Sequence, residues 1–353
     1  LVFLGELAQG RDNNLSLIRM FAASAVLVSH AYPISLGPNV EEPLEALTGR
    51  SLGGLAVAVF FVVSGFLIAE SFNRSRSWRD FLIARVRRLW PALAMSLRIV
   101  ALLLGPLVTT LSPGAYLTNG EVWSFFARNL LLAVPQYTLP GVFETQPYPD
   151  IEGSIWTLFY EVICYLGIFA VGLLGLLRRR LIMSLLLGAF ILLWLAAAII
   201  QPAMHLKAVN MFALGLPFAT GTLMWLWKDR LAVTLWGVGA TIAVTIALAN
   251  TLFYGLALVL FLAYTTFWLA YIPGGWIRNY NRLGDYSYGL YIYAFPAQGL
   301  AVWLTGGDVM SPLANMALAL PLALLPSVLS WHLLEKPALS LRKHPVLARP
   351  PVP

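Results

Sequence analysis

Residues 52–70 read LGGLAVAVFFVVSGFLIAE, a run whose first charged side chain is Glu70 at its end. A helix needs about 20 mostly apolar residues to cross the hydrocarbon core of a bilayer. Runs of similar character recur along the whole chain, and only helices and closed barrels satisfy every backbone group inside lipid. They predict an all-α fold, a polytopic transmembrane bundle of ten spans: residues 15–32, 52–70, 91–110, 154–177, 181–200, 209–227, 231–248, 252–271, 286–304 and 312–334.

The composition of the 353 residues agrees with these spans. Apolar and aromatic residues make up 59% of the chain and charged residues 11%, against about 25% charged in soluble domains. An ordinary soluble domain is therefore excluded, and so is disorder, because disordered chains are poor in apolar residues. The single cysteine, Cys164, excludes an intramolecular disulfide, and the scattered histidines do not predict a metal site. We expect one membrane domain over residues 1–353 without a separate soluble domain and, since the chain opens with Leu1, a longer native N-terminus.

The basic residues predict the orientation of the spans. Of the 23 Lys and Arg, only three lie in loops after odd-numbered spans, and most of the others lie at the termini or after even-numbered spans. Cytoplasmic loops are enriched in Lys and Arg, so we expect both termini in the cytoplasm and read the net charge of +7 as membrane topology rather than nucleic-acid binding. The long loop at 111–153 would then lie outside, where loops of this size usually serve function. Its amphipathic stretch, Trp123 to Val134, is expected to lie in the membrane interface.

Two polar side chains share one face of the first span. Arg19 and His30 are eleven residues apart, which is about 20° beyond three full helical turns and a rise of about 16.5 Å. Charged groups inside a span are costly and are functional candidates by default. The alternative is that Arg19 snorkels to the headgroups while His30 is a hydrogen-bonded packing residue.

Further polar candidates follow along the chain. Arg85 and Arg88 share one helical face that excludes Arg87, and two guanidiniums suit phosphate oxygens, although an ordinary positive-inside loop would have the same composition. Glu161 lies inside the fourth span, where it either orients a basic partner such as His30 or an arginine or stays protonated. Glu335 either caps the tenth helix or pairs with an arginine, and Pro337 is expected to end that helix.

Six segments in register resemble the acyltransferase 3 family of bacterial integral-membrane acyltransferases. They are Arg19 with His30; FFVVSGFLI at 60–68; RVRR at 85–88 leading into WPAL at 90–93; WTLFYE at 156–161; LGDYSYGLY at 283–291; and EKP at 335–337. One departure is Ala294, where many relatives carry a histidine.

The resemblance implies a function for these residues. It implies transfer of an acyl group, usually acetyl from cytoplasmic acetyl-CoA, to a hydroxyl of an extracytoplasmic or lipid-linked saccharide, in the bacterial cytoplasmic (inner) membrane. Because the chain ends soon after its tenth span, it resembles the stand-alone form of the family. We expect catalysis by His30 and Glu161, donor binding by Arg19, Arg85 and Arg88, and no metal. The residues expected to bind substrate are Trp156, Tyr291, Tyr293 and Glu335.

Two questions stay open at this point. His30 either carries the acetyl group itself or deprotonates the sugar hydroxyl for direct attack. The alternative function is a secondary transporter of a sugar or lipid-linked sugar, in which buried Arg, His and Glu would serve a substrate or proton pathway. Release of free CoA from acetyl-CoA would distinguish the enzyme from the transporter.

Overall fold

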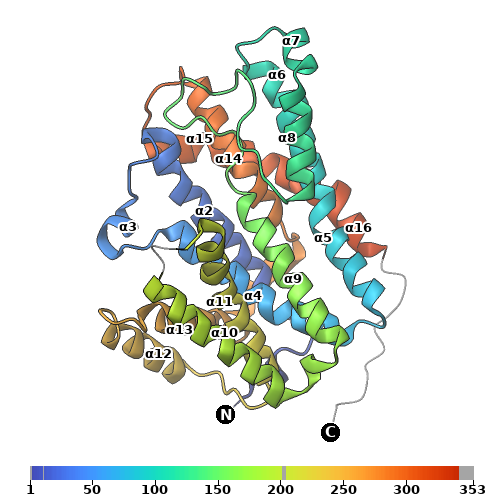
Figure 1. Ribbon diagram of the computed structural model, residues 1–353, viewed down its shortest axis with the longest axis vertical. Helices are drawn as coiled ribbons and strands as arrows, with labels where there is room; N and C mark the ends of the chain where they lie inside the picture. The colour runs from blue at the N-terminus through green and yellow to red at the C-terminus, as the bar shows by residue number, and fades with distance from the viewer. Residues whose placement is uncertain (1, 11, 201–203, 342–353) are drawn as a thin grey trace.

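The computed structural model describes residues 2–10, 12–200 and 204–341, and every regular element among them is helical. The long helices are α2 (Leu15–Leu36), α4 (Leu52–Arg74), α5 (Trp78–Arg98), α9 (Trp156–Leu173), α10 (Arg180–Ile200), α11 (Leu206–Leu226), α13 (Tyr254–Tyr271), α14 (Ser287–Leu304) and α15 (Pro312–Ser330). The shorter ones are α1 (Leu4–Leu7), α3 (Pro43–Thr48), η1 (Ile99–Leu104), α6 (Gly105–Val108), α7 (Pro113–Thr118), α8 (Gly120–Leu131), η2 (Leu176–Arg178), α12 (Leu235–Ala247), η4 (Gly275–Arg282), η5 (Trp331–Glu335) and α16 (Lys336–Ser340). The all-α bundle expected from the sequence is therefore confirmed (Figure 1).

Eight helical segments of the described residues are long and apolar enough to cross a membrane, and they match eight of the ten predicted spans. The prediction for 231–248 is wrong in length, because α12 has only 13 residues and about 20 Å of rise, short of the roughly 30 Å of hydrocarbon. Residues 231–233 are taken up by backbone hydrogen bonds to the N-terminal segment, where Leu4 N–H donates to Leu231 O and Val233 N–H to Val2 O. The other predicted span outside these eight is 286–304, which corresponds to α14. Protein buries α14 along almost its whole length, so its residues need not be as apolar as those of a helix that faces lipid.

Two further boundaries differ from the prediction. The span predicted at 91–110 is the second half of one helical segment, Trp78–Val108, in which Pro91 is accommodated and η1 is a π-helical stretch. The tenth helix does not end at Pro337. It passes through the π-helical η5 into α16, so Pro337 lies inside one continuous helical segment, Pro312–Ser340.

Helix α4 forms the centre of the bundle and packs against α2, α9 and α11. Its contact with α11 is made by glycines: a Cβ at Gly65 would lie 2.0 Å from Phe218 O, and a Cβ at Gly221 would lie 2.0 Å from Val62 O. Small residues of this kind let membrane helices approach closely. On the other side α2 packs on both α4 and α14.

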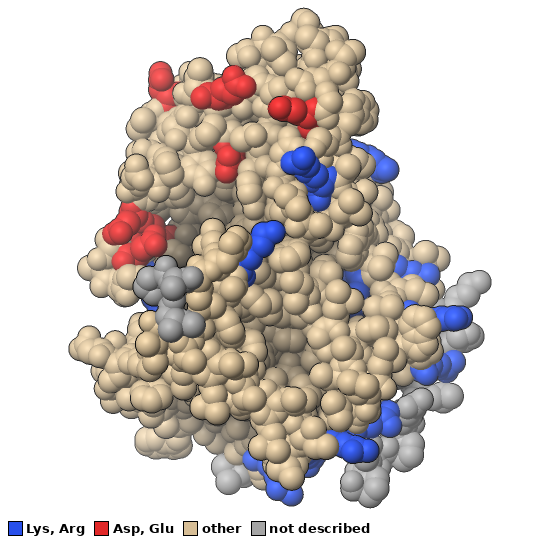
Figure 2. Space-filling model, viewed as in Figure 1, with Lys and Arg blue, Asp and Glu red and all other residues tan. Residues whose placement is uncertain are grey.

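Acidic and basic side chains gather in opposite halves of the molecule. On the face shown in Figure 2, Asp and Glu lie in the upper half and most Lys and Arg in the lower half. We call the region of α3 and the loop 132–155 the acidic end, and the region of the start of α5 and the turn 178–180 the basic end. This is the asymmetry that the positive-inside rule associates with the two sides of a membrane.

Candidate active site

A cavity of about 840 Å³ opens toward the acidic end. Its polar lining includes His30 of α2, Trp156 of α9, and Glu45 and Arg50 from the segment before α4. The surface of the molecule is hollowed beside the acidic group in the upper half of Figure 2. The opposite wall comes from α10, α11 and α13 and is mostly apolar, with Trp194, Phe212 and Leu258 among its residues.

His30 lines this acidic-end cavity from α2. Its ring meets Phe295 edge-on with the centroids 5.3 Å apart. Its Nδ1 atom is buried and has no hydrogen-bond partner among the described residues. A half-buried imidazole that faces a cavity and lacks a structural partner is a candidate base or nucleophile.

A second cavity, of about 590 Å³, opens toward the basic end. Arg19, Arg85 and Arg88 all line it, and Arg87 does not. The helical spacing of Arg85 and Arg88 therefore places them as the sequence predicts. Asn13 helps to set the start of α2 and hence the position of Arg19, because Leu15 N–H donates to Asn13 Oδ1 at 3.0 Å.

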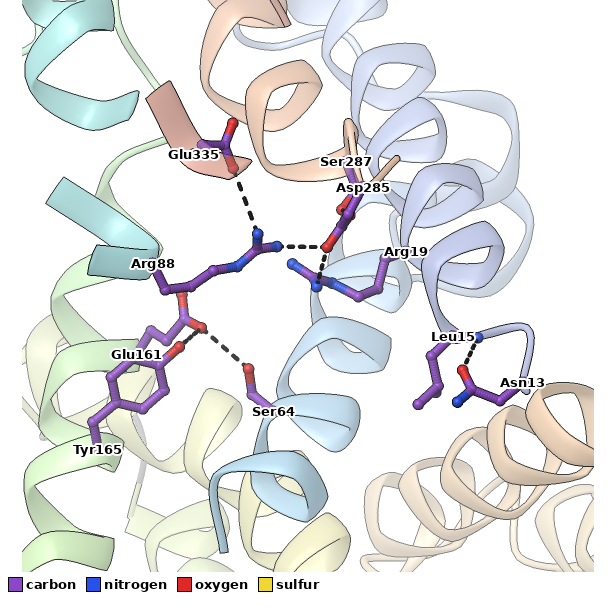
Figure 3. A network of polar contacts seen from close by, with 10 residues as sticks. All are labelled: Asn13, Leu15, Arg19, Ser64, Arg88, Glu161, Tyr165, Asp285, Ser287 and Glu335. Atoms are coloured by element: carbon purple, nitrogen blue, oxygen red, sulfur yellow. Dashed lines mark hydrogen bonds and ion pairs between the residues drawn. The ribbon is translucent and has the colours of Figure 1, made fainter. Parts of the chain in front are cut away.

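Asp285 joins two of these arginines through a single oxygen. Arg19 Nη1 lies 2.6 Å and Arg88 Nη2 lies 2.7 Å from Asp285 Oδ2 (Figure 3). Arg88 Nη1 also lies 3.5 Å from Glu335 Oε2, and Ser287 Oγ donates to Asp285 Oδ1. Burial alone would raise the pKa of Asp285, but the charges of Arg19 and Arg88 outweigh it and lower that pKa from 3.8 to about 2.

Sequence reasoning gave Asp285 no role. The available signal was its position: it is an acid just before a predicted span, on the side where basic residues prevail. Glu335 was expected either to cap its helix or to pair with an arginine, and the structure shows the pairing with Arg88.

Glu161 lies on the wall of the basic-end cavity. Ser64 Oγ donates to its Oε1 at 3.1 Å, and Tyr165 OH donates to the same atom (Figure 3). His30 lines the other cavity, and no hydrogen bond or ion pair joins it to Glu161 among the described residues. Of the alternatives left open by the sequence, a direct Glu161–His30 pair is therefore excluded.

The two cavities share three lining residues, Val57 of α4, Thr157 of α9 and Tyr291 of α14. Thr157 Oγ1 and Tyr291 OH are 2.6 Å apart and buried. Arg19 and His30 thus lie on one helix but line different cavities. The Thr157–Tyr291 contact lies where these two cavities meet. Two other residues expected to bind substrate, Tyr293 and Glu335, are not among the lining residues of either cavity.

Glu152 is a second acid that sequence reasoning did not single out. It lies in the loop before α9 and is fully buried. Ser154 N–H donates to its Oε1 at 3.3 Å, and its Oε2 has no partner among the described residues. Burial raises the pKa of Glu152 from 4.5 to about 8, against the opposing effect of the Ser154 hydrogen bond.

The described residues include candidates for binding an anionic cofactor but no candidate metal site. No group of three or more His, Cys, Asp or Glu placed to hold a metal ion occurs in the part of the chain that the structure describes. Anionic groups have a clear counterpart in the four arginines that line the basic-end cavity, Arg19, Arg74, Arg85 and Arg88.

A helical bundle with eight segments long and apolar enough to cross a membrane belongs to the class of multi-pass membrane proteins. Residues 12–332 match the acyltransferase domain of the acyltransferase 3 family. The chain belongs to this family of acyltransferases, as the six motifs predict, and this favours an enzyme over the transporter alternative.

Individual relatives agree with this assignment. An O-acetyl transferase of Shigella phage Sf6 is 30% identical over 349 residues, which cover 92% of this chain and 96% of the relative. Nodulation protein 10 of Rhizobium leguminosarum bv. viciae is 28% identical, and the match covers 98% of this chain and 98% of the relative. Acyltransferase MdmB of Streptomyces mycarofaciens is 28% identical over 156 residues, covering 43% of this chain and 37% of the relative. No solved structure matches the chain.

Proposed function

We propose that this acyltransferase moves an acetyl group from cytoplasmic acetyl-CoA to a hydroxyl of an extracytoplasmic or lipid-linked saccharide. The observation that carries the proposal is the pair of cavities, one lined by arginines and the other by His30, which meet at Thr157 and Tyr291. The family and the name of the Shigella phage Sf6 relative, O-acetyl transferase, support acyl transfer to oxygen. The basic end faces the cytoplasm of a bacterial inner membrane in this proposal, following the positive-inside rule.

The basic-end cavity is the donor site in this proposal. CoA carries several phosphates, and a guanidinium has five N–H donors in a fixed fork. Asp285 accepts from only one Nη of Arg19 and one Nη of Arg88. The carboxylate therefore orients both guanidiniums and leaves further donors to meet phosphate oxygens.

The acidic-end cavity is the acceptor site. Trp156, Trp194 and Tyr254 give it aromatic surface, while Glu45 and Arg50 place charged groups near its mouth. A few polar groups on a largely apolar and aromatic lining are usual for sites that bind organic ligands. Such a lining offers a saccharide both flat faces and hydrogen-bonding groups.

His30 is the catalytic group of the proposed reaction. In the direct route, neutral His30 takes the proton of the acceptor hydroxyl, the new C–O bond forms, the C–S bond breaks, and the proton passes to the CoA thiolate. In the relay route, the C–S bond breaks as a C–N bond to His30 forms, and the imidazole N–H proton passes to the CoA thiolate. The acceptor oxygen then bonds the acetyl carbon, the C–N bond breaks, and the hydroxyl proton returns to His30. Both routes give the same products, an acetyl ester and CoA with a free thiol.

The test uses the full chain in proteoliposomes with acetyl-CoA and a panel of p-nitrophenyl glycosides as acceptors. We expect release of free CoA matched by acetylated glycoside, and a loss of about 10²–10⁴-fold in His30→Ala, the range for removal of a general base. The matched control is His332→Ala, because His332 is exposed and bonds Tyr286 at the basic end. A wild-type enzyme that releases no CoA, or a His30→Ala variant as active as the control, would overturn the proposal.

A binding measurement tests the donor site separately. Arg85→Ala should weaken acetyl-CoA binding, because a charge-assisted hydrogen bond is worth about 1.5–3 kcal/mol. Arg87→Ala removes the same charge from the same helix but not from the cavity lining, and it should have little effect. Equal effects would indicate a generic basic surface.

A further inference from the structure

The place where the two cavities meet is buried. Of the residues that line either cavity, Val57, Thr157 and Tyr291 are common to both. Each comes from a different helix, and all three are at least nine-tenths buried. We call these three residues the constriction.

Hydrogen bonds hold the polar side of the constriction. Thr157 Oγ1 lies 3.3 Å from Ser154 O, to which its single proton is donated. Tyr291 OH, 2.6 Å from Thr157 Oγ1, is then the donor in that contact. The Phe60 ring packs edge-on against Tyr291 with the centroids 5.7 Å apart, so the phenol is fixed by a hydrogen bond at its tip and an aromatic ring at its side.

The helices behind the constriction are also fixed. The backbone of α4 lies directly against α11 at Gly65 and Gly221, which leaves no space for it to shift toward α11. Helix α14 is tied on both sides, where Tyr288 OH donates to Leu89 O at 3.0 Å and Gln298 Nε2 to Leu27 O at 2.8 Å. The width of the passage therefore depends on the side chains of the constriction rather than on movement of its helices.

We propose that Val57, Thr157 and Tyr291 select the acyl group by length, passing an acetyl-sized group from the arginine-lined cavity toward His30 and excluding longer chains. The inference rests on the proposed function, since it concerns the donor of that reaction. The chemistry is unchanged: the C–S bond of the thioester breaks, the acyl carbon bonds the acceptor oxygen directly or through His30, and CoA leaves as the thiol. A longer acyl chain would have to place its added methylenes among these buried side chains, where extra volume is costly because protein interiors are closely packed.

The experiment measures kcat/KM of wild type and variants with acetyl-, propionyl-, butyryl- and hexanoyl-CoA. Val57→Ala enlarges the passage, and Tyr291→Phe keeps the ring but removes its hydrogen bond to Thr157. Val63→Ala is the matched control, because Val63 lies on the same helix and lines the basic-end cavity alone.

We expect wild type to prefer acetyl- over butyryl-CoA by about 10-fold or more, since each methylene in a tight pocket is worth roughly 10–200-fold. Val57→Ala should reduce this preference several-fold, Tyr291→Phe should reduce it less, and Val63→Ala should keep it. Acetyl-CoA binding and a single size-exclusion peak for each variant show that the protein is folded.

The results distinguish a failure of this inference from a failure of the proposed function. If wild type uses butyryl-CoA as well as acetyl-CoA, or if Val57→Ala keeps the wild-type preference, the constriction does not select the acyl group, while acyl transfer itself stands. If wild type consumes none of the four thioesters, the proposed function fails and this inference fails with it.

Discussion

The shared oxygen of Asp285 should make a measurable contribution to stability. Asp285→Asn keeps the size of the side chain but removes the charge that lies 2.6 Å from Arg19 and 2.7 Å from Arg88. The variant leaves two half-buried guanidiniums without their common carboxylate. We expect a clear loss of stability at pH 7.

The magnitude follows from the pKa of the carboxyl. Lowering the pKa of Asp285 from 3.8 to about 2 corresponds to roughly 2.5 kcal/mol in favour of the ionised folded form. For a chain of 353 residues the loss corresponds to a fall of about 3 °C in Tm. Because the folded pKa is the lower one, this stabilisation is present above pH 3.8 and is lost as the pH falls toward 2, so the gap between wild type and variant should close over that range.

The single cysteine provides the assay. Cys164 is buried, so near pH 7 a thiol-reactive fluorophore added to the protein in detergent reports unfolding as a rise in fluorescence. Between pH 4 and pH 2, where the reactive thiolate is absent, the fluorescence of the 12 tryptophans follows unfolding instead. The control is Asp229→Asn, whose ion pair with Arg180 has the same 2.6 Å distance but is 55% exposed at Asp229, against 13% at Asp285. An exposed pair contributes about 0–1 kcal/mol. If Asp285→Asn lowers Tm no more than Asp229→Asn, Asp285 does not hold the two arginines as we infer.

Two other predictions concern the acidic end. Glu152→Gln should be more stable than wild type by an amount that grows as the pH rises from about 4.5 to about 8. The folded pKa of Glu152 is raised to about 8, so over that range the ionised carboxyl of the unfolded chain must take up a proton on folding, at a cost that grows with pH. Thermal unfolding at pH 5 and pH 8 checks this, and a constant difference would contradict it. In a Cys164→Ala background, Thr145→Cys should react with a membrane-impermeant thiol reagent in intact cells and Ser75→Cys only after permeabilisation; the reverse pattern would place the arginine-lined cavity outside.

Local spacing predicted the site residues that lie close together on one helix. Arg85 and Arg88 are three residues apart, so helical geometry alone puts them on one face, and both line the same cavity. The eight helices long and apolar enough to cross a membrane also follow from local composition, because length and hydropathy are properties of each segment by itself.

Contacts between distant segments could not be predicted in this way. Asp285 lies 266 residues from Arg19, and Thr157 lies 134 residues from Tyr291, so both pairings depend on how the helices pack. The misplaced boundaries have a similar cause. Residues 231–233 bond to the N-terminal segment instead of extending α12, and Pro337 follows a π-helical stretch that lets the chain continue as a helix.

The glycine contact between α4 and α11 has a consequence for how this enzyme tolerates change. Any side chain at Gly65 or Gly221 would force the two helices apart, since no atom larger than hydrogen fits between them. Helix α4 would then move as a unit, shifting Val57 and Ser64 together and disturbing both cavities at once. Small adjustments of specificity are therefore confined to side chains that project from α4 into the cavities, while the two glycines are positions at which a single methyl group damages the whole site.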